Sequence, residues 1–196
     1  MAKFGFGQSV KRVEDARLVK GEGRYTVDVS VPGQAVGFVL RSPVAHATIT
    51  SIDTSAAEAA PGVLCVVTGK ELAAADANNL PCLVPLKNHD GTDRTDPGRQ
   101  ILAVNKVRHV GDHVAFVVAE TMEQAKDAAD LITVDYDTHP AVADMLKAIE
   151  PGAPLVHDST SSNLCFDWVH GDAGATDQAF ASAAKTVKID LINNKV

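Results

Sequence analysis

The chain has few of the residues that would indicate a secreted, membrane-spanning or nucleic-acid-binding protein. It contains only three cysteines among 196 residues and no CxxC pair, so neither a disulfide framework nor an iron–sulfur cluster is expected within it. No apolar run approaches the ~20 residues needed to cross a bilayer, and the first residues lack the apolar centre of a secretory signal. A formal net charge of −7 argues against a surface for nucleic acid. We therefore expect a reduced, cytoplasmic protein.

Aromatic residues are also scarce, at 5%, but the hydrophobic fraction of 45% and the charged fraction of 22% are ordinary for a globular protein. A chain of this length can bury a proper core. Cys65 lies in the apolar run 63–67, where we expect it to be a small core residue.

Two strand–helix–strand patterns follow one another along the chain. The first comprises alternating strands at 34–41 and 48–52, a short helix at 55–60, a β-branched strand at 63–67 and an alanine-rich helix at 69–75. A strand, a helix and a further strand in so few residues predict a compact βαβ-like crossover of right-handed sense.

The second pattern begins with an unbroken apolar strand at 113–119, which is typical of a strand buried on both faces. Thr121 and Gln124 form a capping-box pattern at the start of a helix at 122–129. Met122, Ala125, Ala129 and Ile132 follow at helical spacing, which predicts one buried stripe. A strand at 131–136 follows, and we expect both patterns to share one mixed sheet.

Two further stretches have a different character. Residues 77–99 are rich in Asn, Pro and Gly, which predicts an irregular segment whose contacts lie outside this chain. Residues 141–149 predict a helical turn, and 150–154 a linker. A strand at 163–170, a helix at 175–183 and a strand at 185–192 are expected after the linker. No turn or cap follows the last strand, so we expect another segment or subunit to complete it.

Five segments carry the most specific pattern in the chain. They are GEGRYTVD at 21–28, LRSPVAHATITSIDTSAA at 40–57, PGVLCVVTG at 61–69, VGDHVAFVVAET at 110–121 and VDYDTHPAV at 134–142. In this order they resemble the molybdenum-binding (large) subunit of the aldehyde oxidase, xanthine dehydrogenase and carbon monoxide dehydrogenase family.

The resemblance implies an α+β fold: a hammerhead-like α/β domain with a mixed sheet, followed by the first elements of the molybdenum-cofactor-binding domain. The implied organisation is an N-terminal arm at 1–20, the hammerhead-like domain at 21–143, and a linker with an incomplete start of the molybdopterin-binding domain at 144–196.

Complete members of this family oxidise or hydroxylate an aldehyde, an N-heterocycle or carbon monoxide. Electrons pass from a molybdopterin-type molybdenum cofactor through iron–sulfur clusters, and then to FAD or another acceptor. Because family members are several times longer, we expect the catalytic glutamate and the pterin-binding loops outside this chain. The resemblance thus implies an inactive structural segment that binds no cofactor itself. Its implied partners are the remainder of the molybdenum subunit and the iron–sulfur and flavin subunits. The alternative is a self-contained, non-catalytic binding or scaffold module with the same fold.

The histidines suggest no metal site. His109 and His113 are four residues apart, but Gly111 lies between them in a predicted turn, so a helical ligand pair is not expected. The other histidines are scattered, at His46, His89, His139, His157 and His170. His46 resembles a family feature, and we expect it to hydrogen-bond a neighbouring backbone group.

No other constellation predicts chemistry, and we assign no residue a catalytic, cofactor-binding or metal-binding role. Asp135 and Asp137 share the polar face of a predicted strand, Asp90–Asp93 lacks the remaining EF-hand ligands, and no G-x-S-x-G elbow surrounds Ser42, Ser55 or Ser159. The glycine pairs Gly5/Gly7 and Gly21/Gly23 lack dinucleotide-loop spacing and indicate turns. Arg24 and Arg41, each beside a predicted strand, either contact carboxylates across an interface or are solvated.

Overall fold

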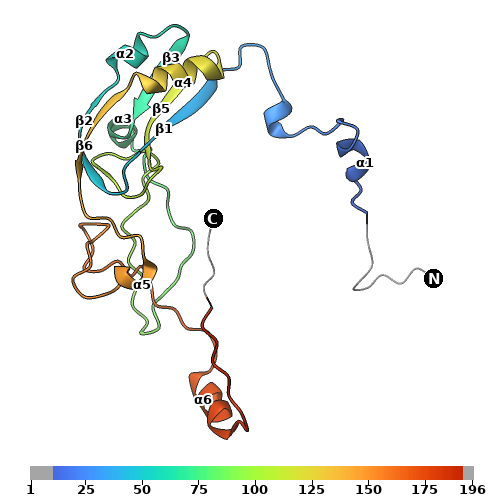
Figure 1. Ribbon diagram of the computed structural model, residues 1–196, viewed down its shortest axis with the longest axis vertical. Coiled ribbons are helices and arrows are strands. Elements are labelled where there is room, and N and C mark those ends of the chain that lie inside the picture. Colours follow the sequence, from blue (N-terminus) through green and yellow to red (C-terminus); the bar gives the residue numbers. More distant parts are fainter. Residues whose placement is uncertain (1–10, 192–196) are drawn as a thin grey trace.

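The folded centre of the molecule consists of two antiparallel three-stranded sheets, seen in a computed structural model that describes residues 11–191 (Figure 1). The first sheet has the order β1-β5-β3, with β1 at Val36–Arg41, β5 at His113–Ala119 and β3 at Val63–Thr68. The second has the order β4-β2-β6, with β4 at Lys106–Val107, β2 at Ala47–Asp53 and β6 at Thr133–Thr138.

Three helices accompany the sheets: α2 at Ser55–Glu58, α3 at Gly69–Ala74 and α4 at Met122–Asp130. Helix α4 begins as predicted, because Thr121 Oγ1 accepts from the Gln124 amide at 3.3 Å and Gln124 Oε1 accepts from the Thr121 amide at 3.0 Å. Alanines dominate the buried face of α4, so its backbone can lie close to β5. The resulting core contains Ala115, Val117 and Ala119 of β5 with Ala125, Ala128 and Ala129 of α4.

A second core lies on the other face of β5. Val114 packs there with Ala47, Ile49, Ala103 and Val107. Strand β5 therefore contributes three residues to the first core and Val114 to the second, while Phe116 and Val118 are half-buried. The prediction of a strand buried on both faces thus holds only in part.

The α+β class is confirmed, but the prediction of one mixed sheet is wrong. Every strand pairing is antiparallel, and β2 and β6 pair with each other in the second sheet while β3 and β5 pair in the first. Helix α2 leads from β2 to β3 and α4 from β5 to β6, so each helix joins strands of different sheets. The predicted βαβ-like crossover is therefore also wrong, because such a crossover joins parallel strands of one sheet.

Two predicted core residues lie at the surface. Cys65 is exposed because the register of β3 shifts between Val63 and Cys65, so Leu64 and Cys65 both face outward before Val66 turns inward. Met122 is 38% exposed at the first position of α4, although Ala125 and Ile132 of the same stripe are buried.

The long segment at 77–99 is irregular, as predicted, but its contacts lie partly within the chain. The His89 amide donates to the Asp167 carbonyl and the Thr95 amide to the Cys165 carbonyl, each at 2.8 Å. These bonds use the backbone of 163–170, which forms no strand, so that prediction is wrong. The predicted interaction outside the chain stays untested.

The described C-terminal residues hold one helix, α6 at Ala173–Ser182, after a short helix α5 at Met145–Ala148. Residues 185–191 form no strand, and Ile192 lies outside the described residues. The apolar side chains of Val187, Ile189 and Leu191 are 70–86% exposed. Since these residues have no β partner among the described residues, the predicted strand is not formed there.

The N-terminal segment projects away from the sheets (Figure 1). It contains α1 at Asp15–Leu18 and a 3₁₀ helix, η1, at Thr26–Asp28. Arg24 therefore precedes a 3₁₀ turn rather than a strand, which corrects the prediction for it. Gly5 and Gly7 lie outside the described residues. Among those described, no helix has the length and apolar character needed to cross a membrane.

Candidate functional site

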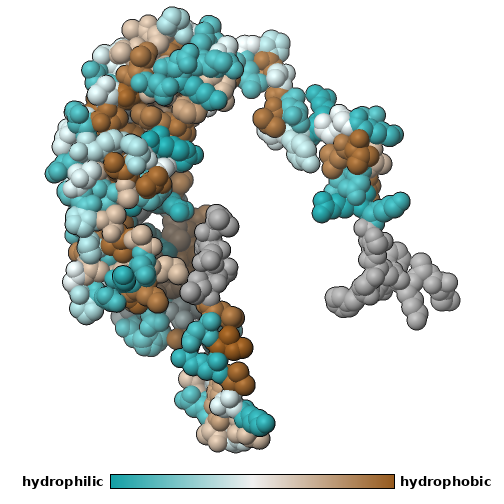
Figure 2. Space-filling model, in the orientation of Figure 1, coloured by the Kyte–Doolittle hydropathy of each residue, from teal (hydrophilic) through white to brown (hydrophobic). Residues whose placement is uncertain are grey.

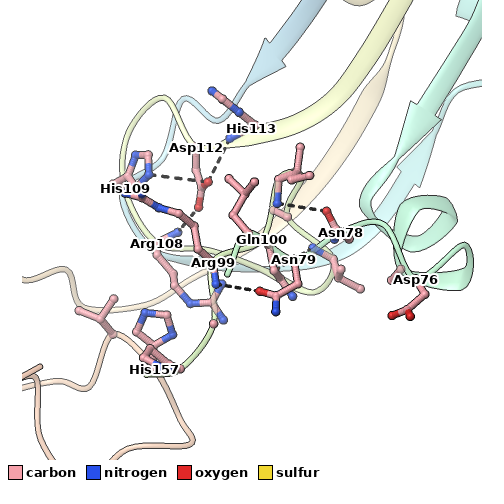
Figure 3. Close-up of a pocket in the computed structure, with 18 residues that line it drawn as sticks. Asp76, Asn78, Asn79, Arg99, Gln100, Arg108, His109, Asp112, His113 and His157 are labelled. Carbon is pink, nitrogen blue, oxygen red and sulfur yellow. Dashed lines mark hydrogen bonds and ion pairs between the residues drawn. The ribbon is translucent and has the colours of Figure 1, made fainter. Parts of the chain in front are cut away.

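A large open hollow lies where the segment that follows α3 meets the start of β5. Its volume is ≈ 910 Å³, and Figure 3 shows polar side chains, among them Arg99, Arg108 and Asp112, on its wall beside apolar ones. Residues 76–80, 97–104, 108–113 and 156–157 supply most of this wall, which we call the loop hollow. It thus combines the irregular segment with a turn before β5 and with two residues that follow α5.

Asn78 fixes one wall of the loop hollow. Its side chain is buried and donates to the carbonyls of Gly69 at 3.2 Å and Leu102 at 2.8 Å. Its Oδ1 accepts from the amides of Ile101 at 3.2 Å and Leu102 at 2.9 Å. The amide therefore joins both ends of the irregular segment to α3. Sequence reasoning counted Asn78 only as a loop former, because its partners lie up to 24 residues away.

A tight turn before β5 forms the opposite wall. The carboxylate of Asp112 accepts from the amides of Arg108 at 2.9 Å and His113 at 3.0 Å, and Gly111 takes a φ of +83°. His109 Nε2 lies 3.7 Å from Asp112 Oδ1. His109 and His113 both line the loop hollow, but they lie on the two sides of this turn rather than on one face of a helix. Among residues 11–191, no group of three or more His, Cys, Asp and Glu is placed to hold a metal ion.

The basic side chains of the hollow are incompletely paired. Lys106 Nζ contacts both oxygens of Asp158, at 2.6 and 2.9 Å. Arg108 donates through Nη1 to the Lys106 carbonyl at 3.2 Å, while its buried Nε has no hydrogen-bond partner in the described part of the chain. Arg99 is exposed at the rim. Burial and then the positive charge of Arg108 lower the pKa of His157.

Two further histidines, His46 and His139, lie next to each other where β2 begins and β6 ends. His46 Nδ1 donates a hydrogen bond to the Pro140 carbonyl at 2.9 Å, so the predicted backbone contact is confirmed. His139 Nε2 lies 2.7 Å from Thr48 Oγ1, and the two rings meet edge to face at 5.3 Å. His46 Nε2 is the other buried nitrogen without a partner among the described residues.

The remaining predicted polar groups act locally. Asp135 accepts from Ser51 Oγ at 2.6 Å, and Asp137 is exposed. Asp90 accepts from the amide and hydroxyl of Thr92, and these bonds lower the pKa of Asp90. Ser42 Oγ donates to the Val44 carbonyl at 2.8 Å. These contacts stabilise turns and strand pairs.

Other predicted side chains are equally engaged with near neighbours. Ser55 Oγ donates to Asp53, and the bonds from Ser55 lower the pKa of Asp53. His89 contacts Asp167 at 2.9 Å. Arg41 donates from Nη1 to the Gly111 carbonyl at 3.1 Å, which makes it part of the turn before β5. The remaining histidine, His170, stacks on Trp168 with 5.6 Å between ring centroids.

The sequence and the fold match a known family. The sequence model described as "Aldehyde oxidase and xanthine dehydrogenase, a/b hammerhead domain" matches residues 20–140, more than half of the chain. The chain belongs to this family, and its α+β centre is a hammerhead domain of the molybdenum hydroxylase type.

Relatives of known identity extend the likeness to most of the chain. The carbon monoxide dehydrogenase large chain of Afipia carboxidovorans is 38% identical over 91% of this chain and 22% of its own length. The nicotine 6-hydroxylase large subunit of Paenarthrobacter nicotinovorans is 38% identical over 92% of this chain and 21% of its own. This chain therefore spans about a fifth of the length of these relatives.

Solved structures give the same result. The Cu,Mo-CO dehydrogenase in its carbon monoxide reduced state superposes with a TM-score of 0.71 at 37% identity, covering 92% of this chain and 23% of that one. Quinoline 2-oxidoreductase from Pseudomonas putida 86 has a TM-score of 0.71 at 38% identity, covering 81% of this chain and 19% of that one.

Proposed function

We propose that the chain is the N-terminal structural segment of a molybdenum hydroxylase large subunit, with a role in scaffolding and subunit docking rather than in the chemical step. The observation that carries this proposal is the match of residues 20–140 to the hammerhead domain, within relatives roughly five times as long. In the complete enzyme, the reaction we propose is oxidation or hydroxylation of an aldehyde, an N-heterocycle or carbon monoxide.

The cofactor belongs, in this proposal, to the remainder of the subunit. One relative is called a large molybdopterin subunit and one solved neighbour a Cu,Mo enzyme. The loop hollow does not fit a pterin well, because the polar groups of Asn78 and Asp112 are already committed to backbone partners of this chain. We therefore keep the proposal that no catalytic, cofactor-binding or metal-binding residue lies in this chain, and derive no chemical step through it.

The partners we propose are the remainder of the molybdenum subunit, followed by iron–sulfur and flavin subunits. Relatives named as a large chain, a large subunit and a subunit gamma of a dehydrogenase complex support an assembly of several polypeptides or domains. Within this chain we propose an arm at 1–20, the hammerhead domain at 21–143, and a linker with the start of the cofactor domain at 144–196. We propose the cytoplasm as its compartment, which suits three exposed free thiols.

The test is to place an affinity tag at the N-terminus of the protein in its native host and to identify what purifies with it. Peptide mapping should then find cofactor-domain sequence of this family in the purified material, either in the same polypeptide or in a tightly bound one. A free hammerhead module, recovered without any such sequence, would refute the proposal and favour the self-contained scaffold. A Val117→Asp variant is the control, because a charge in the core should abolish recovery of the complex.

A further inference from the structure

We propose that the loop hollow receives a carboxylate side chain from the remainder of the large subunit, held by the guanidinium group of Arg108 with Arg99 at the rim. This inference rests on the proposed function, because it needs further polypeptide to supply the carboxylate. It names a docking contact that the family match does not specify.

The first support is an unmet hydrogen-bonding requirement. A buried polar nitrogen without a partner is rare in native proteins, since leaving it unpaired costs about 1–3 kcal/mol. The two side-chain nitrogens of this kind in the described chain are Arg108 Nε and His46 Nε2. Arg108 lies close enough to His157 for its positive charge, after the larger effect of burial, to lower the pKa of His157. His46 Nδ1 donates to the Pro140 carbonyl, so Nε2 of the neutral ring is an acceptor, and the N–H that calls for a carboxylate is Arg108 Nε.

The second support is the balance of charge around the hollow. Hydrogen bonds from Lys106 and the charge of nearby Arg108 lower the pKa of Asp158, but both oxygens of Asp158 are bound to Lys106. Both oxygens of Asp112 accept from backbone amides. Arg99, Arg108 and Asp76 all line the hollow, and neither arginine forms an ion pair with a carboxylate among residues 11–191. A carboxylate entering that space would meet donors with a planar, bidentate geometry.

The third support is the position of the hollow in the molecule. Its floor belongs to the hammerhead domain, whereas Val156 and His157 belong to the segment that follows it. The hollow therefore lies at the boundary where the chain leaves the family's hammerhead domain. Since the relatives are several times longer than this chain, the proposed subunit supplies further polypeptide, and we place its packing at this boundary. Figure 3 shows Arg99, Arg108 and His157 close to one another along the hollow.

The test uses the complete subunit, purified through its N-terminal tag. An Arg108→Lys variant retains the positive charge and introduces an amine, which a zero-length carbodiimide couples only to a carboxylate in contact. Mass spectrometry should identify a cross-link from position 108 to an Asp or Glu outside residues 1–196. Arg41→Lys is the matched control, because Arg41 is exposed and its side chain bonds the Gly111 carbonyl of the turn before β5. It should give at least tenfold less of any such cross-link.

The other outcomes separate the two proposals. If the tagged protein contains cofactor-domain sequence but position 108 couples to Asp112 or Asp158, or to nothing, the docking contact is wrong and the proposed function stands. If no further polypeptide is present, both fall. A free oxyanion is tested on the 196-residue chain with inorganic phosphate: if millimolar phosphate slows phenylglyoxal modification of Arg108 tenfold while Arg41 is unaffected, a small anion is the occupant and the proposal is overturned.

Discussion

At the scale of single residues, the important groups were those whose partners lie far away in the sequence. The backbone contact of His46 was predictable, because it belongs to a segment that resembles the family. Asn78 was not, since its four hydrogen bonds join Gly69 to residues 101–102 across the irregular segment. Cys65 was wrongly expected in the core because a register shift in β3 cannot be read from an apolar run.

The four hydrogen bonds of the Asn78 side chain lead to a prediction about stability. Asn78→Ala should lower the free energy of unfolding by about 1–3 kcal/mol, because buried backbone groups of Gly69 and Leu102 lose their partner. Urea denaturation monitored by circular dichroism measures this change. Asn79→Ala is the control, since exposed Asn79 makes a single bond to the Arg99 amide and should cost about 1 kcal/mol or less. Equal losses in both variants would contradict the role of Asn78.

The pKa of His157 gives a pH prediction. Burial and then Arg108 lower it below the ordinary 6.5, with smaller effects from Asp158, which raises it, and from His46 and Lys106, which lower it. As pH falls below about 6.5, His157 is protonated in the unfolded chain before it is protonated in the folded one. The contribution of His157 to stability is therefore present above that pH and is lost as pH falls below it. Arg108→Gln removes a positive charge and should raise the pKa of His157, as measured by NMR titration. An unchanged or lower pKa of His157 would contradict the described electrostatic effect of Arg108.

At the scale of elements, helix and strand types were predictable where periodicity and capping agreed. Helix α4 and strand β5 were found close to their predicted bounds, because Thr121 with Gln124 marks a helix start and 113–119 is continuously apolar. The pairing of the strands was not predictable, since alternation says which face is buried but not which strand is the neighbour. For the same reason 163–170 and 185–192 were expected as strands, yet neither 163–170 nor 185–191 pairs with another strand in the described chain.

The start of α4 is testable directly. Thr121→Ala removes the hydroxyl that accepts from the Gln124 amide and should lower the free energy of unfolding by about 1 kcal/mol. Thr121→Ser keeps the hydroxyl and should have a much smaller effect. Differential scanning calorimetry of the two variants measures the difference, and identical transition temperatures for both would show that the cap contributes nothing to stability.

At the scale of the whole molecule, the family was predictable from five ordered segments, whereas the docking environment was not. The apolar side chains of Phe180, Val187, Ile189 and Leu191 are more than half exposed, and Figure 2 shows brown residues on the projecting α6 region. Together with Arg99 and Arg108, which form no ion pair with a carboxylate among residues 11–191, they describe a surface suited to burial in a larger assembly. The sequence predicted that 185–192 needs a partner, but it could not predict the loop hollow, because exposure depends on which segments the fold leaves uncovered.

The central claim is that this chain serves as a supporting lobe of a molybdenum enzyme. The most direct measurement is elemental analysis of the N-terminally tagged protein, purified from its native host and passed over a size-exclusion column. The account predicts molybdenum in stoichiometric ratio to the hammerhead domain, eluting at a size well above that of a 196-residue monomer. Stable, folded monomer without molybdenum would contradict it.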